Sequence, residues 1–305
     1  MQQITVRVPA STSNLGPGFD CLGVALRIYD SVTIAPVSSR QHFHPQIVSE
    51  AADRFFNRTR RRPFPFSSSI TKQIPQSRGL GSSATIRLGV LLALNRLSGN
   101  PLDRLKVFQL CAELEGHPDN AAPAIFGGFT VVGLAGGRDA ALRRPVGSAR
   151  RAYQGDVLIV QRFAVSRRLH FVLFIPDLEI RTVASRSVLP SKISHNAAVK
   201  NCADACTLTA AFASGDYKKL RGVFADYLHQ PFRAKLIPFL PRVVAVAEKA
   251  GALGAFLSGS GSTIAAVTLH SSEKIAAAMV GAAKIPGRTI ITHADNNGAK
   301  ILTSH

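Results

Sequence analysis

The sequence predicts a protein of two domains that mixes helices and strands. A chain of 305 residues is long for a single hydrophobic core and is comfortable for two. Runs with the two-residue alternation of strands and runs with the apolar spacing of helices follow one another along the chain. A glycine-rich loop joins a strand to a helix near residue 80. We place the domain boundary near Val165, which gives domains 1–165 and 166–305.

Apolar periodicity predicts the individual elements in chain order. We expect strands over residues 2–8, 25–35, 69–74, 127–132, 157–163, 169–176, 253–257, 264–267 and 289–294. We expect helices over residues 47–56, 86–97, 102–115, 197–213, 220–228, 243–250 and 275–284. The helix over 197–213 has a continuous side of Ala, Val, Leu and Cys, which predicts core packing. Loops are expected over 36–46, over the Gly- and Pro-rich segment 9–23, and around Gly136, Gly137, Arg143, Arg144, Arg150 and Arg151.

Composition limits the class of protein. The hydrophobic share of 46% is that of an ordinary globular chain, and no run of 18 apolar residues predicts a membrane span. The N-terminus has no basic segment followed by an apolar one, so we expect a cytoplasmic protein without a signal peptide. The scattered cysteines predict buried thiols; a metal pair at the last two is the less favoured alternative. They are Cys21, Cys111, Cys202 and Cys206.

Net charge is the unusual feature, with 37 basic and 18 acidic residues and a formal charge of +19. The densest basic cluster runs from Arg58 to Phe66 and includes two phenylalanines. Basic residues beside aromatic ones can bind nucleic acid. A positive surface also attracts anionic substrates such as ATP. Because no known nucleic-acid-binding motif accompanies the cluster, we expect no specific nucleic acid partner.

The glycine-rich loop is the strongest local signal. Pro75 stops the preceding strand, and Gly79 and Gly81 precede a long apolar helix. A helix start leaves backbone N–H groups unpaired and carries partial positive charge, which suits phosphate. For a Gly-x-Gly pair alone, an ordinary serine-capped helix start is the more frequent explanation. No lysine follows the second glycine, so this is not a Walker A loop; the third glycine is missing, with Ser82-Ser83 in its place, so it is not a dinucleotide-binding fingerprint either.

The full wording of the loop is more specific. Pro75-Gln76-Ser77-Arg78-Gly79-Leu80-Gly81-Ser82-Ser83-Ala84 resembles the ATP-binding motif of the GHMP kinases. A second glycine-rich loop, Ser258-Gly259-Ser260-Gly261-Ser262-Thr263, resembles their third motif, with Ser262 where proline is usual. The resemblance implies that the second loop packs against the first across the two domains. It assigns nucleotide binding to Pro75, Arg78, Gly79, Leu80, Gly81, Ser82, Ser83, Ala84, Gly259, Ser260 and Gly261.

The segment from Pro9 to Gly23 reads as a constrained loop that presents short polar side chains. It is similar to the N-terminal signature of the homoserine kinase branch of the GHMP kinases. That similarity implies that Asn14 and Asp20 contact homoserine, with Asp20 on the amino group. An ammonium group needs a fixed carboxylate, which agrees with this assignment.

Three further segments resemble the same branch. Residues 112–128 resemble the second motif, which implies that Glu113 and Ser83 bind Mg2+ and that His117, Asp119 and Asn120 line the acceptor site. Residues 180–190 imply Thr182 beside the reacting phosphate and Arg186 on the substrate carboxylate. Residues 230–238 imply a second carboxylate ligand, Arg233. Taken alone, His117 would be a loop histidine and Arg233 a surface charge.

Together these six signatures occur in the expected order from residue 9 to residue 263 and identify the chain as a member of the homoserine kinase branch. The implied fold is α+β, with an N-terminal domain like domain 2 of ribosomal protein S5 and a ferredoxin-like C-terminal domain. The implied reaction is transfer of the γ-phosphoryl of ATP to the hydroxyl of L-homoserine, a step of threonine biosynthesis, by a homodimer. Asn14 and Asn120 would orient the hydroxyl. Another GHMP small-molecule kinase and a basic nucleic-acid-binding protein are the alternatives.

Overall fold

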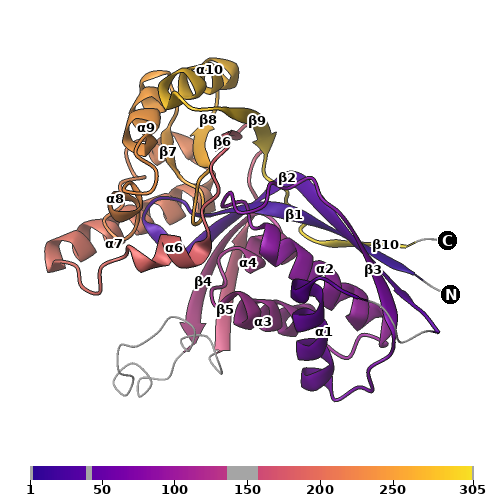
Figure 1. Cartoon of the computed structure of the whole chain (residues 1–305). Coiled ribbons are helices and arrows are strands. Elements are labelled where there is room, and N and C mark those ends of the chain that lie inside the picture. Colours follow the sequence, from indigo (N-terminus) through magenta and orange to yellow (C-terminus); the bar gives the residue numbers. More distant parts are fainter. Residues whose placement is uncertain (1–2, 39–42, 136–156, 304–305) are drawn as a thin grey trace.

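Two antiparallel sheets, each covered by helices, make up the molecule (Figure 1). The computed structural model describes residues 3–38, 43–135 and 157–303. The first sheet has six strands in the order β10-β1-β2-β4-β5, with β3 on β2. Its strands are β1 (Ile4–Asn14), β2 (Gly18–Pro36), β3 (Phe66–Thr71), β4 (Phe129–Ala135), β5 (Val157–Phe163) and β10 (Lys300–Thr303).

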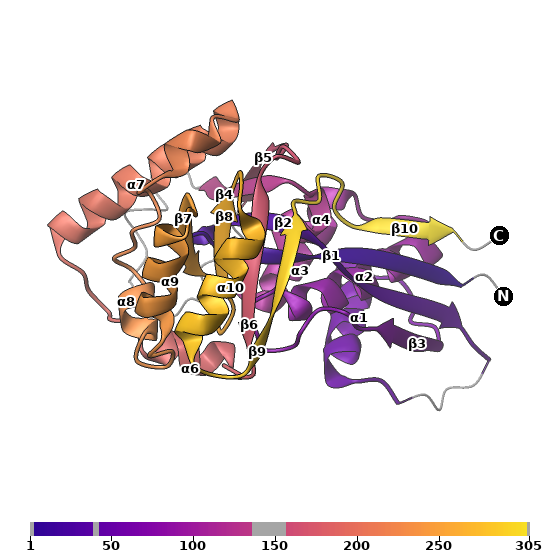
Figure 2. The same cartoon turned by 90° about the horizontal axis from the view of Figure 1, so that it is seen from above.

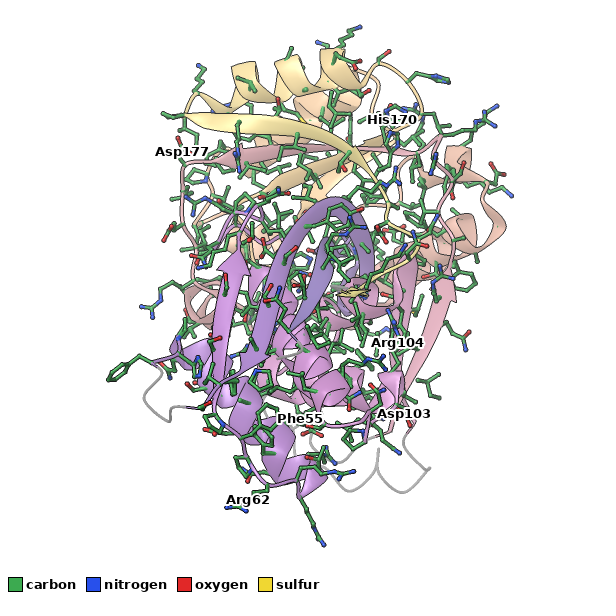
Figure 3. All side chains as sticks on the ribbon, turned by 90° about the vertical axis from the view of Figure 1, so that its right-hand side faces the viewer. Phe55, Arg62, Asp103, Arg104, His170 and Asp177 are labelled. Carbon is green, nitrogen blue, oxygen red and sulfur yellow. The ribbon has the colours of Figure 1, made fainter. Side chains whose placement is uncertain are left out.

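Four helices lie on one side of the first sheet (Figure 1). They are α1 (Gln46–Thr59), α2 (Ser82–Leu97), α3 (Arg104–Glu115) and α4 (Ala121–Phe126). Helix α2 is buried on most of its surface, as its apolar sequence predicts, and ends at Leu97 before Ser98 and Gly99. Phe55 of α1 is fully buried and Figure 3 shows it among these helices.

The second sheet has the strand order β7-β8-β6-β9. Helices α9 (Leu240–Lys249) and α10 (Ser272–Ala283) cover one face of it (Figure 2). Its strands are β6 (His170–Pro176), β7 (Gly254–Leu257), β8 (Ile264–Thr268) and β9 (Gly287–His293). The remaining elements of this half are α6 (Thr182–Ser187), α7 (His195–Ser214), the 3-10 helix η2 (Tyr217–Leu220) and α8 (Gln230–Arg233).

A shared hydrophobic core joins the two halves. Val24 and Leu26 of β2 lie in one cluster with Phe171 and Leu173 of β6. Strand β1 contributes to two cores, because Val8 packs under the helices whereas Ala10 packs against the second half. The β1–β2 register shifts between Pro9 and Ala10, at this change of core. A continuous apolar interface fixes the cavity between the halves more firmly than a polar one would.

Most predicted elements are confirmed within a few residues, and two predictions of secondary structure are wrong. The helix expected over 220–228 is only the end of η2 followed by irregular chain. The segment expected as a loop from Pro9 to Gly23 is mostly strand, because β1 continues to Asn14 and β2 begins at Gly18. Helices α4, α6 and α8 and strand β10 were not expected. The loop predicted around Gly136 to Arg151 lies outside the described residues.

The boundary near Val165 stays a prediction. It falls between β5, which belongs to the first sheet, and β6, which is the first strand of the second sheet along the chain. Strand β10 pairs with β1, so the end of the described chain returns to the first sheet. None of the helices in the described ranges has the length and apolar character of a membrane span.

Helix α7 corrects two expectations about burial. Figures 1 and 2 show it along the outer edge of the second half. It packs inward through Asn201, Leu208 and Phe212, whereas Val199 is 52% exposed. Cys202 and Cys206 are exposed and not buried, because their side of the helix faces outward. The other two thiols lie inside the fold as expected, one buried and one partly buried.

The basic cluster after α1 does not present its aromatic rings to solvent. Arg62 is exposed, and Figure 3 shows it at the end of the molecule formed by α1. Phe64 and Phe66 instead pack on each other, with Phe64 against Phe56. Base stacking needs accessible ring faces, so the aromatic part of the nucleic-acid alternative loses its basis here.

Candidate active site

A cavity of about 140 Å³ opens between the two halves, where the six sequence signatures meet. This space suits the reacting ends of two ligands better than a complete nucleotide, since whole ligand sites span about 300–1,000 Å³. The lining residues are Ser13, Asn14, Asp20, Pro75, Ser77, Arg78, Gly79, Leu80, Gly81, Ser82, Ser83, Glu115, His117, Asp119, Asn120, Ile180, Thr182, Arg186, Arg233, Gly259 and Ser260. Of the predicted site residues, only Ala84, Glu113 and Gly261 are missing from this lining.

The glycines of the first loop are required by conformation and by space. Gly81 caps α2 in the left-handed region at φ 72° and Gly79 has φ 73°. A Cβ at Gly81 would lie 2.2 Å from Ser11 Oγ, and one at Gly79 would lie 2.1 Å from the carbonyl oxygen of Ser258. Any side chain at either position would therefore strain the backbone and displace a neighbouring segment.

The two glycine-rich loops are bonded to each other across the halves, as the resemblance implies. Ser258 Oγ donates to the carbonyl of Gly79 at 2.7 Å, and the Thr263 N–H donates to the carbonyl of Arg78 at 3.1 Å. Arg78 also donates from Nε to the carbonyl of Pro176 at 3.0 Å. The first loop is thus held by both halves, which fixes its amides relative to the acceptor side of the cavity.

The start of α2 leaves donors available for an anion. The first amide bonded back into the helix is that of Thr85, to the carbonyl of Gly81 at 3.0 Å. The N–H groups before it have the partial positive charge of a helix N-terminus. Ser82 Oγ is buried and has no hydrogen-bond partner among the described residues. A buried unpaired hydroxyl costs free energy unless a ligand satisfies it.

Glu115, and not Glu113, lies beside the phosphate loop. Ser83 Oγ donates to Glu115 Oε1 at 2.7 Å, and Arg87 donates to the same oxygen. Glu113 instead pairs with Arg54 and Arg58, each at 2.5 Å. Residues two positions apart on a helix point to nearly opposite sides of it, so only one of the two carboxylates can face α2. The predicted partner of Ser83 is therefore corrected from Glu113 to Glu115.

Asp20 and Arg186 form a two-point ion pair on the acceptor side of the cavity. Arg186 donates to the Asp20 carboxylate at 2.6 and 3.0 Å. Asp20 comes from the start of β2 and Arg186 from α6, so the pair spans the two halves. The Phe19 ring faces both guanidinium groups: its centre lies 5.5 Å from Cζ of Arg186 and 5.2 Å from Cζ of Arg233. Aromatic faces attract such cations.

Arg233 is a buried cation without an acid partner. Only 2% of the residue is exposed, yet no carboxylate of the described residues forms an ion pair with it. Its Nε and Nη1 donate to the carbonyls of Ser185 and Gly259 at 3.2 and 2.9 Å. Burial, followed by the nearby Arg186 charge, lowers the pKa of Arg233 to about 10. Removing a charge from water is costly unless it is paired, so this group favours an anionic ligand.

The predicted asparagines hold the walls together. Asn14 donates to the carbonyl of Gly259 at 2.9 Å and accepts from the Asp20 N–H at 3.0 Å. Asn120 accepts from Ser11 Oγ at 2.8 Å and donates to Ser13 Oγ at 3.0 Å. Both amides are engaged by the protein, which makes them positioning groups in this state.

His117 and Asp119 form a pair at the cavity wall, 2.8 Å apart. Burial opposes the charge on His117, but the Asp119 carboxylate and its hydrogen bond outweigh burial and raise the pKa of His117. Thr182 begins α6 and lines the cavity as predicted.

Sequence reasoning missed several residues that build the site. Asp30 accepts from the amides of Gln73 and Ile74 and from Thr85 Oγ1, and so fixes both sides of the phosphate loop. A sequence signal existed for Glu115: it follows Cys111 by four residues, and Cys111 faces α2 through the carbonyl of Ala84. The remaining missed residues are Ser13, Phe19, Ser77, Arg87, Ile180, Asp226 and His229.

Comparison with known proteins agrees with this geometry. The family model "GHMP kinases N terminal domain" matches residues 46–128, and "GHMP kinases C terminal" matches 208–284. A homoserine kinase of Moorella thermoacetica is 38% identical over 289 residues, which is 91% of each chain. The chain belongs to the homoserine kinase family of the GHMP kinases.

Solved structures place this GHMP kinase in the same fold. The crystal structure of homoserine kinase from Cytophaga hutchinsonii matches with a TM-score of 0.83 and 26% identity, over 99% of this chain and 98% of the other. Streptococcus pneumoniae phosphomevalonate kinase matches with a TM-score of 0.67 and 13% identity, covering 99% and 100%. The predicted two-part α+β fold is confirmed. A GHMP kinase uses ATP as phosphoryl donor, which agrees with the anion-binding character of the first loop.

Proposed function

We propose that this kinase transfers the γ-phosphoryl group of ATP to the side-chain hydroxyl of L-homoserine. The observation that supports it most is the buried, acid-free Arg233 next to the Asp20–Arg186 pair. An α-amino acid carries one positive and one negative charge. Its ammonium can replace Arg186 on Asp20 while its carboxylate takes Arg186 and Arg233, so that every charge in the site gains a partner.

The phosphate side of the cavity would bind the triphosphate of ATP. The amides at residues 79–84 and the unpaired Ser82 hydroxyl supply donors for phosphate oxygens. The hydroxyl oxygen of the acceptor forms a bond to the γ-phosphorus as the bond to the ADP oxygen breaks. No side chain is assigned as general base, because positioning and charge neutralisation carry most of phosphoryl transfer.

Ser83 and Glu115 are the residues that would hold Mg2+. Their hydroxyl and carboxylate oxygens are hard donors of the kind this ion prefers, and no partner of Glu115 Oε2 occurs among the described residues. No set of three or more His, Cys, Asp and Glu ligands gathers in the described ranges, so phosphate oxygens and water would complete the shell. When bound, Mg2+ neutralises charge on the β- and γ-phosphates.

A parallel measurement of ADP release tests the proposal. L-homoserine, mevalonate, galactose and shikimate are compared with two matched analogues of homoserine. 4-Hydroxybutanoate lacks the ammonium group, and 2-amino-1,4-butanediol lacks the carboxylate. We expect L-homoserine to give the highest kcat/KM and both analogues to lose at least about tenfold, since each leaves a charged group of the site unpaired. Equal rates with mevalonate or 4-hydroxybutanoate would favour another GHMP kinase activity.

A homodimer and a cytoplasmic location stay predictions. Light scattering of the wild type tests the dimer: the protein should give twice the monomer mass. Monomeric wild type at micromolar concentration would reject the dimer.

A further inference from the structure

A buried histidine lies directly behind Arg233. His229 has no exposed surface and immediately precedes α8, the short helix that ends at Arg233. Its ring stacks on Phe19, with centres 5.2 Å apart and planes inclined by 27°. Phe19 in turn lies below Arg233. The histidine and the arginine are thus parts of one packed unit at the acceptor end of the cavity.

The surroundings of the ring determine which nitrogen carries the proton. His229 Nε2 lies 3.0 Å from the carbonyl oxygen of Gly16 and 3.3 Å from Asp226 Oδ2. Both neighbours are acceptors, so Nε2 must be the N–H donor. In the neutral ring Nδ1 then has a free lone pair. Arg233 Nη1 lies 3.3 Å from Nδ1 and donates to it.

Asp226 forms no ion pair with Arg233 among the described residues, because its carboxylate is bonded to backbone groups. Its carboxylate accepts the backbone N–H groups of Leu228 at 2.8 Å, His229 at 3.2 Å and Gln230 at 2.5 Å. The acid therefore fixes the start of α8 and the donor side of the histidine ring. Arg233 itself donates only to neutral acceptors, namely the histidine nitrogen and two carbonyl oxygens. Its direction is fixed while its positive charge stays available to a ligand.

We propose that neutral His229 is the positioning residue that aims Arg233 at the carboxylate of the acceptor; this inference rests on the proposed function. A carboxylate in place of the imidazole would compete with the substrate for the guanidinium. A protonated imidazole would turn an N–H toward Arg233 and repel it. A neutral acceptor satisfies one guanidinium nitrogen and leaves the charge uncancelled.

The neutral form persists over the physiological pH range. Burial lowers the pKa of His229 to about 4; Asp226 acts against this change and Arg233 acts with it. Asp119 is the other charged group that acts on the ring, and it also opposes the decrease. We therefore expect the KM for homoserine to be unaffected by His229 titration between about pH 6 and pH 8.

Two substitutions separate the two sides of the ring. His229→Gln reaches the Gly16 carbonyl with its terminal amide and loses the acceptor at the Nδ1 position. His229→Asn has its amide oxygen near the Nδ1 position and loses the contact to Gly16. We expect His229→Gln to raise the homoserine KM about tenfold or more, with the ATP KM changed less than about twofold. His229→Asn should recover most of this loss.

The diol that lacks a carboxylate distinguishes positioning from general damage. Its kcat/KM should be the same for wild type and His229→Gln, because no carboxylate is present for Arg233 to bind. In an Arg233→Met background, His229→Gln should add no further loss for homoserine. Equal losses for homoserine and the diol, or an Asn variant no better than Gln, would overturn the proposal.

A spectroscopic readout separates this inference from the proposed function. Long-range 15N–1H spectra of the ligand-free wild type at pH 7 should show His229 as the Nε2–H tautomer, and Arg233→Met should shift its Nδ1 signal. A charged ring or the other tautomer would refute the geometry. Wild type without activity on homoserine but with this tautomer would remove the proposed function, and with it the acceptor role, while confirming the contact to Arg233.

Discussion

Replacing Arg233 by methionine tests the recognition of the acceptor. The change removes the charge and the guanidinium donors and keeps much of the apolar stem. A hydrogen bond to a charged group contributes about 1.5–3 kcal/mol, so kcat/KM for homoserine should fall by about tenfold to about a hundredfold. Arg186 still offers a cation to the carboxylate, which is why we do not expect complete loss. The KM for ATP should change less than about twofold.

The same substitution changes how strongly homoserine stabilises the fold. At a homoserine concentration about a hundred times the wild-type Kd, ligand binding adds about 2.7 kcal/mol to the free energy of unfolding. If the Kd rises about a hundredfold, that gain falls to about 0.4 kcal/mol. For a chain of this size these values correspond to Tm increases of about 5 °C and about 1 °C. Differential scanning fluorimetry with and without homoserine measures the difference.

Arg242 provides a matched control. It is an arginine of α9 that donates to the carbonyls of Ala282 at 2.5 Å and Ala283 at 3.1 Å, outside the cavity. Arg242→Met removes a similar side chain with similar partners, so homoserine should stabilise this variant as strongly as the wild type. An equal homoserine-induced Tm increase in Arg233→Met and Arg242→Met would refute the assignment of Arg233.

Three further predictions concern the metal site, a titrating pair and the thiols. Glu115→Gln should lower kcat about a hundredfold or more at saturating Mg2+. Glu113→Gln affects only ion pairs with exposed arginines, so its kcat should be close to that of the wild type. The opposite order of the two kcat values would make Glu113 the metal ligand. Burial opposes the charge on His117, but Asp119 outweighs it and raises the pKa of His117 above 6.5. The stability that this charged pair adds is therefore present below about pH 6.5 and is lost as pH rises through the raised pKa. In thermal unfolding from pH 6 to pH 8, the wild type should lose Tm relative to His117→Asn, and a Tm difference independent of pH would contradict this. At pH 8, a thiol reagent should rapidly label the exposed Cys202 and Cys206 and leave Cys21 and Cys111 unreacted. Burial, with smaller contributions from Asp119 and Asp20, raises the pKa of Cys21 to about 12, and Cys111 is buried. A double variant at Cys202 and Cys206 that still reacts rapidly would disprove the exposure of α7.

The sequence alone predicts the phosphate loop well because its requirements are local. Positive φ at Gly79 and Gly81, and a helix directly after them, follow from neighbouring residues. The same holds for β6 and β8 of the second sheet, whose apolar runs are short and continuous. In contrast, β10 is a four-residue edge strand whose pairing with β1 depends on contacts almost 300 positions apart in the chain, and no local pattern specifies it.

The details of the site depend on contacts that no local pattern contains. The resemblance predicts that Asp20, Arg186 and Arg233 line one cavity. Their hydrogen-bond partners in this structure depend on three different segments. Arg186 pairs with Asp20, whereas Arg233 has only neutral acceptors and Asp226 is used to cap α8. Glu113 and Glu115 differ in the side of α3 from which they project, which depends on how α3 packs against α1 and α2.

A crystal structure with a nonhydrolysable ATP analogue, Mg2+ and L-homoserine tests the central claim most directly. We predict phosphate oxygens within hydrogen-bond distance of the amides at residues 79–84, the metal between Ser83 and Glu115, and the homoserine carboxylate on Arg233 with its ammonium on Asp20. A nucleotide bound away from this loop, or a homoserine carboxylate that does not contact Arg233, would contradict the account.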